Sequence, residues 1–229
     1  MPIQTRIATL LDLPSLVALN HAAYPDLLEE GVVFEEGQLR AHQGVFPEGQ
    51  RVAVEEGVVV GAIATLILPR TIDPLRAHTW MGVTDGGTFA RHDPEGDTLY
   101  LADVYVGPQS WGKGVGKALY TELFDLCRRL RLARIVAGGR LYGYSELAET
   151  MTPHEYVARV VRGELKDRVL DSQLRAGFAI RGILPNYLHD WRSRHFATLL
   201  EWECLESRRP ARHEGASTGE PRPSARRPA

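Results

Sequence analysis

The residues with the clearest chemical potential form a glycine-rich stretch, residues 107–116, which reads GPQSWGKGVG. Glycines stand at every second position from Gly112 to Gly116, with Lys113 between the first two. Glycine lets a backbone turn sharply and approach a ligand closely, and the unpaired amides that begin a helix attract anions. Because a strand pattern precedes this stretch and a helical pattern follows it, the sequence predicts a phosphate site; a merely tight turn is the alternative.

Two common phosphate motifs fit this stretch poorly. Read from Gly107, it satisfies the first part of a Walker A loop, but Gly114 stands where that motif needs the hydroxyl that holds Mg²⁺. The next strand pattern, residues 134–139, ends without an aspartate. A dinucleotide fingerprint needs GxGxxG in an early β-α-β unit, whereas this chain has GxGxG in its middle. A nucleotide-phosphate hydrolase and a dinucleotide enzyme are therefore disfavoured.

The patterns before the glycine stretch predict strands joined by hairpins, with helices between them. Residues 3–9 alternate as a strand does, and Asp12 followed by Pro14 begins a helix that runs to about Pro25. A weaker helix is expected at 35–45. Residues 51–55 and 58–68 are rich in β-branched residues and are separated by Glu56 and Gly57, which is a hairpin signal. Residues 69–97 hold many glycines and prolines and predict a long loop, and a strand follows at 99–106.

The second half of the sequence predicts further helices and strands. A helix is expected from Gly114 to about Leu130, then a short strand at 134–137. Thr152 and Glu155 form a capping box for a helix that stops near Gly163, and a helix at 168–176 ends at Gly177. Strands at 178–184 and 196–202 complete the series. This order predicts one α/β domain over residues 1–205, with an insertion at about 138–167 and a mixed, mostly antiparallel sheet of about seven strands flanked by helices.

Composition excludes several classes of protein. The chain has 229 residues and a net charge of −2, and 44% of its residues are apolar, as in ordinary globular proteins. The last segment, residues 206–229, holds six arginines, three glutamates and four prolines and predicts disorder. The remaining 205 residues therefore carry −5, the wrong charge for a nucleic-acid surface. Weak binding of anionic partners by the tail is the alternative to a plain solvated end.

Other sequence signals point to a cytoplasmic protein without metal. No apolar run approaches a membrane span, and the first residues lack a signal peptide's apolar core. Cys127 and Cys204 are too few for a disulfide framework, and the eight histidines show no metal-ligand spacing. Of the 27 basic residues only three are lysines, and two of them, Lys113 and Lys117, lie at the glycine stretch. Their placement suits a phosphate group but is also compatible with chance.

Residues 101–119, LADVYVGPQSWGKGVGKAL, resemble the acetyl-coenzyme A loop of the GCN5-related N-acetyltransferases, the GNAT superfamily. That loop has the pattern Gln/Arg-x-x-Gly-x-Gly/Ala between the fourth strand and the third helix of the fold. The predicted order of elements matches the same fold over roughly residues 3–203. One position departs from the pattern, since Trp111 stands where glutamine or arginine is usual.

A second resemblance covers the C-terminal half. Residues 136–144, 151–157, 162–165, 174–178 and 182–187 resemble the acetyltransferase-type domain that some bacteria carry ahead of a nitrilase-like carbon–nitrogen hydrolase. No hydrolase sequence follows in this chain. This resemblance supports the fold and transfers no substrate.

The GNAT resemblance implies acyl transfer from acetyl-CoA, without a metal, to an amine held in the same complex. It implies that the pantetheine arm pairs with the strand around Val104, Tyr105 and Val106. It also implies that the pyrophosphate lies on amides of residues 111–117, namely Trp111, Gly112, Lys113, Gly114, Val115, Gly116 and Lys117. A main-chain amide near Val104 or Tyr105 would stabilise the thioester oxyanion.

The catalytic residues are less well determined. Asp103 is a candidate general base because it lies on the strand beside the expected thioester. Alternation places it on the same face as Leu101 and Tyr105, but which face meets the cleft stays open. Gln173 occupies the position of the tyrosine that many family members use as an acid, so Tyr144 and Tyr187 become the candidate acids. For Asp103 and both tyrosines, a purely structural role is the alternative.

The sequence thus leaves more than one function open. The first hypothesis is an N-acetyltransferase acting on a small-molecule or peptide amine, and the alternative is a non-catalytic coenzyme-A-binding sensor or docking module. Loop 69–97 and segment 138–167 would roof the acceptor pocket or form a homodimer contact. Acidic residues in these two segments would suit a cationic amine. No membrane or nucleic-acid partner is expected.

Overall fold

A computed structural model describes residues 2–205, so the predicted disordered tail lies outside the described residues. Its centre is a seven-stranded sheet with the order β1-β2-β3-β4-β5-β7-β6. Neighbouring strands run antiparallel except β4 and β5, which are parallel, so the predicted mixed sheet is confirmed. The strands are β1 (Gln4–Ile7), β2 (Arg51–Glu55), β3 (Val58–Leu68), β4 (Thr98–Val106), β5 (Arg134–Arg140), β6 (Ala179–Leu184) and β7 (Ala197–Glu203).

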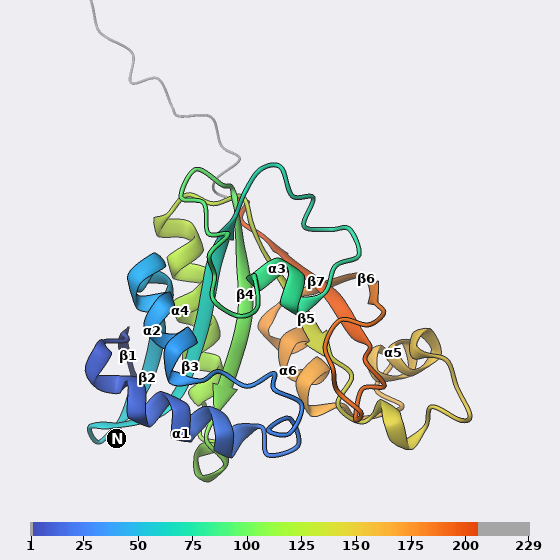
Figure 1. The fold of residues 1–229 in the computed structure, drawn as a ribbon. Helices are drawn as coiled ribbons and strands as arrows, with labels where there is room; N and C mark the ends of the chain where they lie inside the picture. Colours follow the sequence, from blue (N-terminus) through green and yellow to red (C-terminus); the bar gives the residue numbers. More distant parts are fainter. Residues whose placement is uncertain (1, 206–229) are drawn as a thin grey trace, which may run out of the picture.

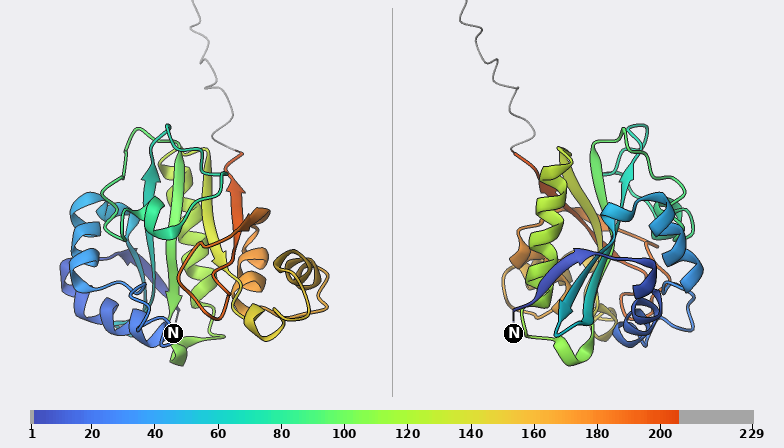
Figure 2. Two further views of the ribbon diagram at one scale, coloured as in Figure 1. Left: turned by 45° about the vertical axis from the view of Figure 1, so that its right-hand side comes forward. Right: turned by 90° about the vertical axis from the view of Figure 1, so that its left-hand side faces the viewer.

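Helices cover both faces of the sheet (Figure 1). One face carries α1 (Leu13–Ala23), α2 (Glu36–Val45) and the short α3 (Trp80–Thr84). The other face carries α4 (Val115–Arg129) and α6 (Arg168–Ala176), with α5 (Pro153–Val161) packed beside α6. Figure 2 shows α1 and α2 on the opposite side of the sheet from α4. The sheet therefore separates two hydrophobic cores, which we call the α1 side and the α4 side.

Local sequence signals explain most element boundaries. The β2–β3 turn places Glu56 at φ 51° and Gly57 at φ 81°, the left-handed conformation that glycine tolerates best. The Thr152–Glu155 capping box is present at the start of α5. Asp167 accepts from the amides of Val169 and Leu170 at the start of α6, and Gly177 ends that helix at φ 103°.

Two elements differ from the sequence prediction. Residues 69–97 are not a plain loop, because they contain α3, whose Trp80 donates its indole N–H to the Ala102 carbonyl at 2.9 Å. Strand β5 extends to Arg140 rather than ending at Ala137. The predicted insertion began at about residue 138, yet Gly138 and Gly139 lie inside the strand and are needed there. A Cβ atom at Gly138 would overlap the ring of Tyr187, and one at Gly139 would overlap Gln173.

The sheet opens between β4 and β5. Their pairing runs from Thr98 with Arg134 only as far as Leu101 with Ala137. Beyond that point β4 stays paired with β3, and β5 stays paired with β7. A bulge in β4 at Ala102 marks the start of the opening, because the register with β3 shifts between Leu101 and Asp103. The free edges of the two strands thus face each other without bonding.

Candidate active site

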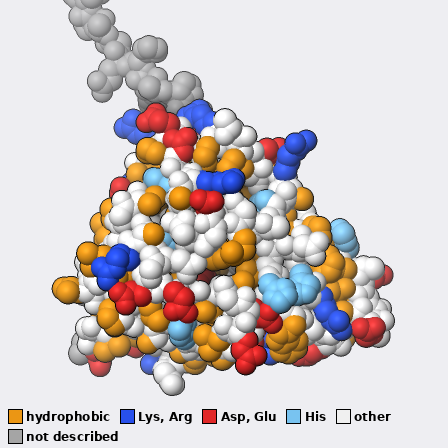
Figure 3. Space-filling model, viewed as in Figure 1, with side chains coloured by type: hydrophobic (Ala, Val, Ile, Leu, Met, Phe, Trp, Pro, Cys, Tyr) orange, Lys and Arg blue, Asp and Glu red, His pale blue; other side chains and the backbone are white. Residues whose placement is uncertain are grey.

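A cavity of about 470 Å³ lies in this opening and extends to both faces of the sheet. On the α1 side it is lined by residues of α1 and its following loop, α3 and the β6–β7 loop, among them Tyr24, Leu27, Trp80, Tyr187 and Leu188. On the α4 side it is lined by the start of α4 and by α6, including Gly114, Val115, Tyr120, Ser172 and Gln173. Figure 3 shows the α1 side hollowed near its centre, with hydrophobic and histidine side chains around the hollow. Two ligands could therefore enter from opposite faces and meet inside the sheet.

The glycine stretch forms the α4-side mouth of the cavity. Gly112 and Gly114 have φ values of 76° and 87°, and α4 begins directly after them. The amide of Ala118 is bonded to the Gly114 carbonyl, so the amides of Val115, Gly116 and Lys117 form the unpaired first turn. Apart from the adjoining backbone, no atom of residues 2–205 lies within 4 Å of where a Cβ would stand at Gly112, Gly114 or Gly116. This open cradle of amides fits a phosphate group such as the pyrophosphate of coenzyme A.

Most of the predicted cofactor residues lie around the cavity, and two do not. The lining includes Val104, Tyr105, Val106, Trp111, Gly112, Gly114, Val115 and Gly116. Lys113 and Lys117 are exposed and lie outside the lining. The Lys113 ammonium is 3.5 Å from the Glu55 carboxylate. The lysine pair therefore borders the loop rather than the cavity.

Trp111 has a role that the sequence did not reveal. Its indole N–H donates to the Val106 carbonyl at 2.9 Å, which ties the loop to the end of β4. The guanidinium of Arg168 lies 4.6 Å from the Trp111 ring centroid and 4.0 Å from that of Tyr142. Trp111 thus fixes the loop and connects it to the start of α6 across the mouth of the cavity.

Backbone groups of β4 point into the opening. The Val104 carbonyl accepts from the Tyr24 hydroxyl at 3.0 Å, and the Val106 carbonyl accepts from Trp111. Because the N–H and C=O of one strand residue point to the same side, the amides of Val104 and Val106 also face the opening. Of the two amides predicted for an oxyanion, Val104 is the one on the open edge.

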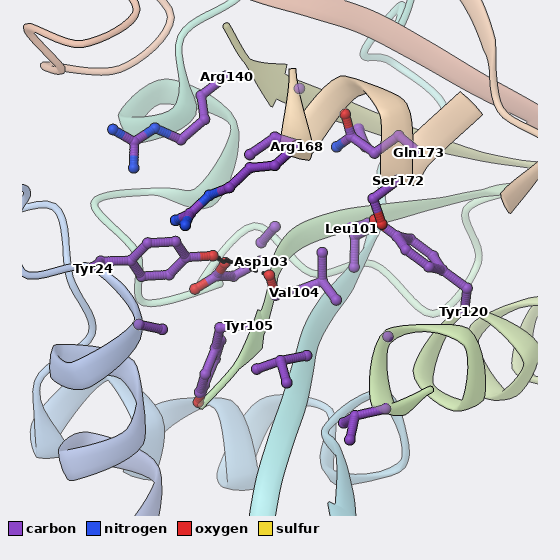
Figure 4. Close-up of a pocket in the computed structure, with 18 of the residues that line it drawn as sticks. Tyr24, Leu101, Asp103, Val104, Tyr105, Tyr120, Arg140, Arg168, Ser172 and Gln173 are labelled. Carbon is purple, nitrogen blue, oxygen red and sulfur yellow. Dashed lines mark hydrogen bonds between the residues drawn. The ribbon is translucent and has the colours of Figure 1, made fainter. Parts of the chain in front are cut away.

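Asp103 lies at the centre of the site, on the α1 side. Its carboxylate accepts from the Tyr24 hydroxyl at 2.6 Å and from the Asn20 amide at 3.0 Å (Figure 4). Burial raises the pKa of Asp103 to about 6, although the bonds from Tyr24 and Asn20 act in the opposite direction. A carboxyl group with such a pKa can both accept and return a proton near neutral pH.

The predicted neighbours of Asp103 were partly wrong. Alternation placed Leu101, Asp103 and Tyr105 on one face, whereas Leu101 packs in the core of the α4 side. Tyr105 and the partners of Asp103 belong to the α1 side. The bulge at Ala102 inserts one residue between them and reverses the alternation. This irregularity is what turns the carboxylate towards α1.

The two candidate tyrosines are placed differently. Tyr187 lines the cavity on the α1 side, and its hydroxyl lies 2.8 Å from that of Tyr100. Tyr144 does not line the cavity. Its hydroxyl donates to the Met151 carbonyl at 3.1 Å, and its ring packs against Tyr156 and Phe196. The structure therefore brings Tyr187 to the site and gives Tyr144 a packing role.

Several residues of the candidate site were not predicted because they looked like helix core positions. Tyr24 and Asn20 lie on α1 or directly after it, and both contact Asp103. Tyr120 of α4 lines the cavity together with Ser172 of α6. Gln173, which the sequence analysis did single out, lines the cavity close by, and its buried Oε1 has no hydrogen-bond partner among the described residues. Helical spacing alone does not distinguish such residues from ordinary core.

Arg140 holds together the two loops that frame the α1 side of the cavity. Its Nε and Nη2 donate to Asp190 at 2.8 and 2.7 Å, and Nη2 also donates to Asp26 at 2.7 Å. Asp26 lies in the loop after α1, and Asp190 lies in the β6–β7 loop. All three groups are largely buried. The spacing of the mouth therefore depends on this ion-pair cluster, which we call the Arg140 clamp.

The charges around the cavity differ from the expected acidic roof. Among the described residues, the one carboxylate in the lining is Asp103, and the cations are Arg140, Arg168 and Arg175. The acidic residues of loop 69–97 and of segment 138–167 do not line it. Over residues 2–205, no group of His, Cys, Asp and Glu side chains could hold a metal ion. In the same part of the chain, no helix is long and apolar enough to cross a membrane.

Comparison with known sequences agrees with this geometry. The chain matches the acetyltransferase (GNAT) family over residues 13–141. It is 33% identical over 192 residues to the uncharacterized N-acetyltransferase YkwB of Bacillus subtilis, covering 84% of each chain. It is also 37% identical over 196 residues to the probable hydrolase YhcX of the same organism. That match covers 85% of this chain but only 37% of YhcX, and the predicted link to a nitrilase-like hydrolase stays a prediction.

Solved structures share the fold. The loading GNATL domain of CurA from Lyngbya majuscula superposes with a TM-score of 0.76 at 21% identity, over 89% of this chain and 98% of that one. The GphF GNAT-like decarboxylase in complex with isobutyryl-CoA gives 0.73 at 23% identity, over 87% and 98%. The sheet that opens between β4 and β5, the glycine cradle before α4 and these matches lead to one conclusion: the chain belongs to the GNAT family of acetyltransferases.

Proposed function

We propose that this protein transfers an acetyl group from acetyl-CoA to a primary amine, carried by a small molecule or a peptide, by direct attack within one complex. The observation that carries the proposal is the cavity through the sheet. One mouth bears the amide cradle, the other bears Asp103, and the open edge of β4 runs between them. Acetyl-CoA would supply the activated acyl group as a thioester.

The residues on the α4 side suit the binding of the donor. The amides of Val115, Gly116 and Lys117 would hold the pyrophosphate, and the helix dipole of α4 would add to the attraction. The outward backbone groups of Val104 and Val106 would bond the pantetheine arm as a neighbouring strand would. The Val104 amide would then stabilise the negative charge on the thioester oxygen, a contribution of about 3 kcal/mol for one such donor.

Asp103 is the group best suited to move the proton during attack. A carboxylate with a pKa of about 6 is ionised at neutral pH and can take a proton from the attacking nitrogen. The same group, once protonated, can give that proton to the departing sulfur. Gln173 cannot donate a proton usefully at neutral pH, and burial raises the pKa of Tyr120 far above neutrality, so neither competes well with Asp103 as an acid.

A thiol-release assay tests this function. Acetyl-CoA and isobutyryl-CoA are each supplied with polyamines, aminoglycosides, amino acids and peptides, and calorimetry measures acyl-CoA binding in parallel. The expected result is coenzyme A release with one class of amine, together with a large loss in Asp103→Asn. Binding without turnover across the panel would identify a binding module instead, and Mg²⁺-dependent ATP binding without acyl-CoA binding would favour a nucleotide-phosphate hydrolase.

A further inference from the structure

We propose that Tyr187, Tyr100 and His78 form a proton relay, which removes a proton from the acceptor's ammonium group in the cavity and delivers it to solvent. The proposal rests on the proposed function, because it assigns a step that an amine acceptor requires. Amines are mostly protonated at neutral pH and must lose a proton before they attack. The relay would perform this first deprotonation.

Three side chains form a continuous hydrogen-bonded path. The hydroxyl oxygens of Tyr187 and Tyr100 are 2.8 Å apart, and the Tyr100 oxygen is 3.0 Å from Nε2 of His78. Tyr187 lines the cavity, Tyr100 is fully buried behind it, and His78 is partly exposed on loop 69–97. The path therefore runs from the acceptor side of the cavity to the surface.

The position of Tyr187 depends on glycine at position 138. The phenol ring and oxygen lie directly over Gly138, where any Cβ would overlap them. Gly138 lies on the free edge of β5 and itself lines the cavity. The reactive oxygen of Tyr187 is thus held at the opening between the strands.

The backbone fixes the direction of the relay. Nδ1 of His78 is 2.8 Å from the Arg76 carbonyl, which can only accept, so Nδ1 carries the hydrogen. In the neutral ring Nε2 must then accept, and Tyr100 donates to it. Tyr100 can consequently accept from Tyr187, which leaves a lone pair of the Tyr187 oxygen free for a donor in the cavity. Both hydroxyl hydrogens point away from the cavity.

The end of the relay is ready to receive a proton. Burial lowers the pKa of His78, despite its bond to the Arg76 carbonyl, so the ring is neutral at pH 7. The titratable rings that face it are Tyr100 and Tyr187, with centroids 5.5 and 5.9 Å away. Both are uncharged phenols at this pH because burial raises their pKa values.

The transfer balances when it is concerted. The ammonium N–H bond breaks as a new O–H bond forms on Tyr187, whose original hydrogen moves to Tyr100. The Tyr100 hydrogen moves to Nε2 of His78, which becomes an imidazolium and then releases a proton to water. No tyrosinate accumulates. Asp103 subsequently moves the second nitrogen proton to the sulfur, so one proton per turnover leaves the protein, as acylation of an ammonium requires.

Tyr100→Phe tests the relay at its middle, because Tyr100 does not line the cavity. With an alkylamine that the wild type acetylates, kcat/KM at pH 7 should fall by about 10²-fold, the usual scale of proton-transfer catalysis. The loss should shrink as the pH rises towards the amine pKa, since solvent then supplies neutral amine. With an acceptor that is already neutral at pH 7, such as a hydrazine or an arylamine, the variant should match the wild type.

The matched control is Tyr156→Phe, which removes another buried hydroxyl, bonded to Asp167, on the α4 side. This variant should change neither the pH dependence of kcat/KM nor the ratio of kcat/KM between the charged and the neutral acceptor. His78→Gln should reproduce Tyr100→Phe and covers the case in which that variant fails to fold. Equal loss with charged and neutral acceptors, or no loss in either variant, would overturn the relay while leaving the acetyltransferase function intact.

A second measurement is independent of turnover. Nitrogen-15 shifts of His78 at pH 8 should report a protonated Nδ1 and an unprotonated Nε2. A protonated Nε2 would overturn the relay whatever the assay shows. If instead the tautomer is as expected but no amine is acetylated, the proposed function fails, and the relay fails with it because its substrate is missing.

Discussion

Replacing Arg140 should destabilise the fold and loosen the acceptor mouth together. Arg140 is 8% exposed, and its partners Asp190 and Asp26 are 0% and 14% exposed, so Arg140→Met leaves two buried carboxylates without their cation. Removing one partner of a buried ion pair typically costs about 3–5 kcal/mol. For a chain of this length, that corresponds to a decrease in Tm of about 6–20 °C.

Thermal and urea unfolding measure the loss. The control is Arg40→Met, which breaks an exposed pair with Glu36 in α2 and should cost about 0.5 kcal/mol or less. In the double variant Arg140→Met, Asp190→Asn, the buried charge of Asp190 is removed, so part of the stability should return. This recovery separates the cost of an unpaired charge from the cost of lost packing.

The Arg140 clamp should also affect binding of the amine acceptor more than binding of the acyl-CoA donor. It joins the loop that carries Leu27 to the loop that carries Tyr187 and Leu188, all of which line the α1 side of the cavity. Below the unfolding transition, Arg140→Met should raise the KM for the amine and leave acyl-CoA affinity nearly unchanged. Stability equal to the wild type, or a selective loss of acyl-CoA binding, would refute this account of the clamp.

The remaining predictions concern the cradle, the base and the cavity wall. Gly114→Val should weaken acyl-CoA binding, measured by calorimetry, by about tenfold or more, since a β-branched residue at φ 87° strains the loop. The control Gly163→Val, at φ 75° and remote from the cavity, should leave acyl-CoA binding unchanged. Equal weakening in both variants would contradict the proposed role of the cradle. The kcat/KM should fall as the pH drops through about 6, where Asp103 takes up a proton, and Asp103→Asn should remove this step along with most of the rate. The pKa of Asp103 in the folded protein lies above the ordinary value of 3.8. The stability that Asp103 contributes is therefore present below about pH 4 and is lost as the pH rises through about 6. If Asp103→Asn still showed this loss of stability with rising pH, Asp103 would be excluded as its source. Gln173→Leu should raise the Tm, because it removes a buried carbonyl oxygen that has no partner among the described residues, and a lowered Tm would show that this oxygen is satisfied in solution.

Much of the architecture followed from short-range signals. The hairpin at Glu56 and Gly57, the capping box of α5 and the end of α6 at Gly177 are set by residues within a few positions of each other, and all were predicted. Helix α3 was not, because Gly82, Gly86 and Gly87 disfavour a helix locally. What holds it is distant: Trp80 donates its backbone amide to the Tyr187 carbonyl and its indole to Ala102.

The candidate site likewise could be predicted only where its residues are close together in the sequence. The glycine cradle is contiguous in sequence and was predicted with the residues that line it. Asp103 was predicted as a candidate, but its orientation depends on a bulge that alternation does not encode. Its partners Tyr24 and Asn20 lie about 80 residues away, and the path from Tyr187 to His78 joins three separate segments. Such contacts arise only when the whole sheet is assembled.

The short pairing between β4 and β5 has a mechanical consequence. Four residue pairs at one end join two half-sheets, β1 to β4 and β5 to β7, whose other ends stand apart. A ligand arm bonded to the free edge of β4 would supply backbone pairing that β5 does not give. The donor would then be a temporary structural element as well as a reactant: its arrival would stiffen the molecule, and its departure after each turnover would restore the compliance that the next exchange of ligands needs.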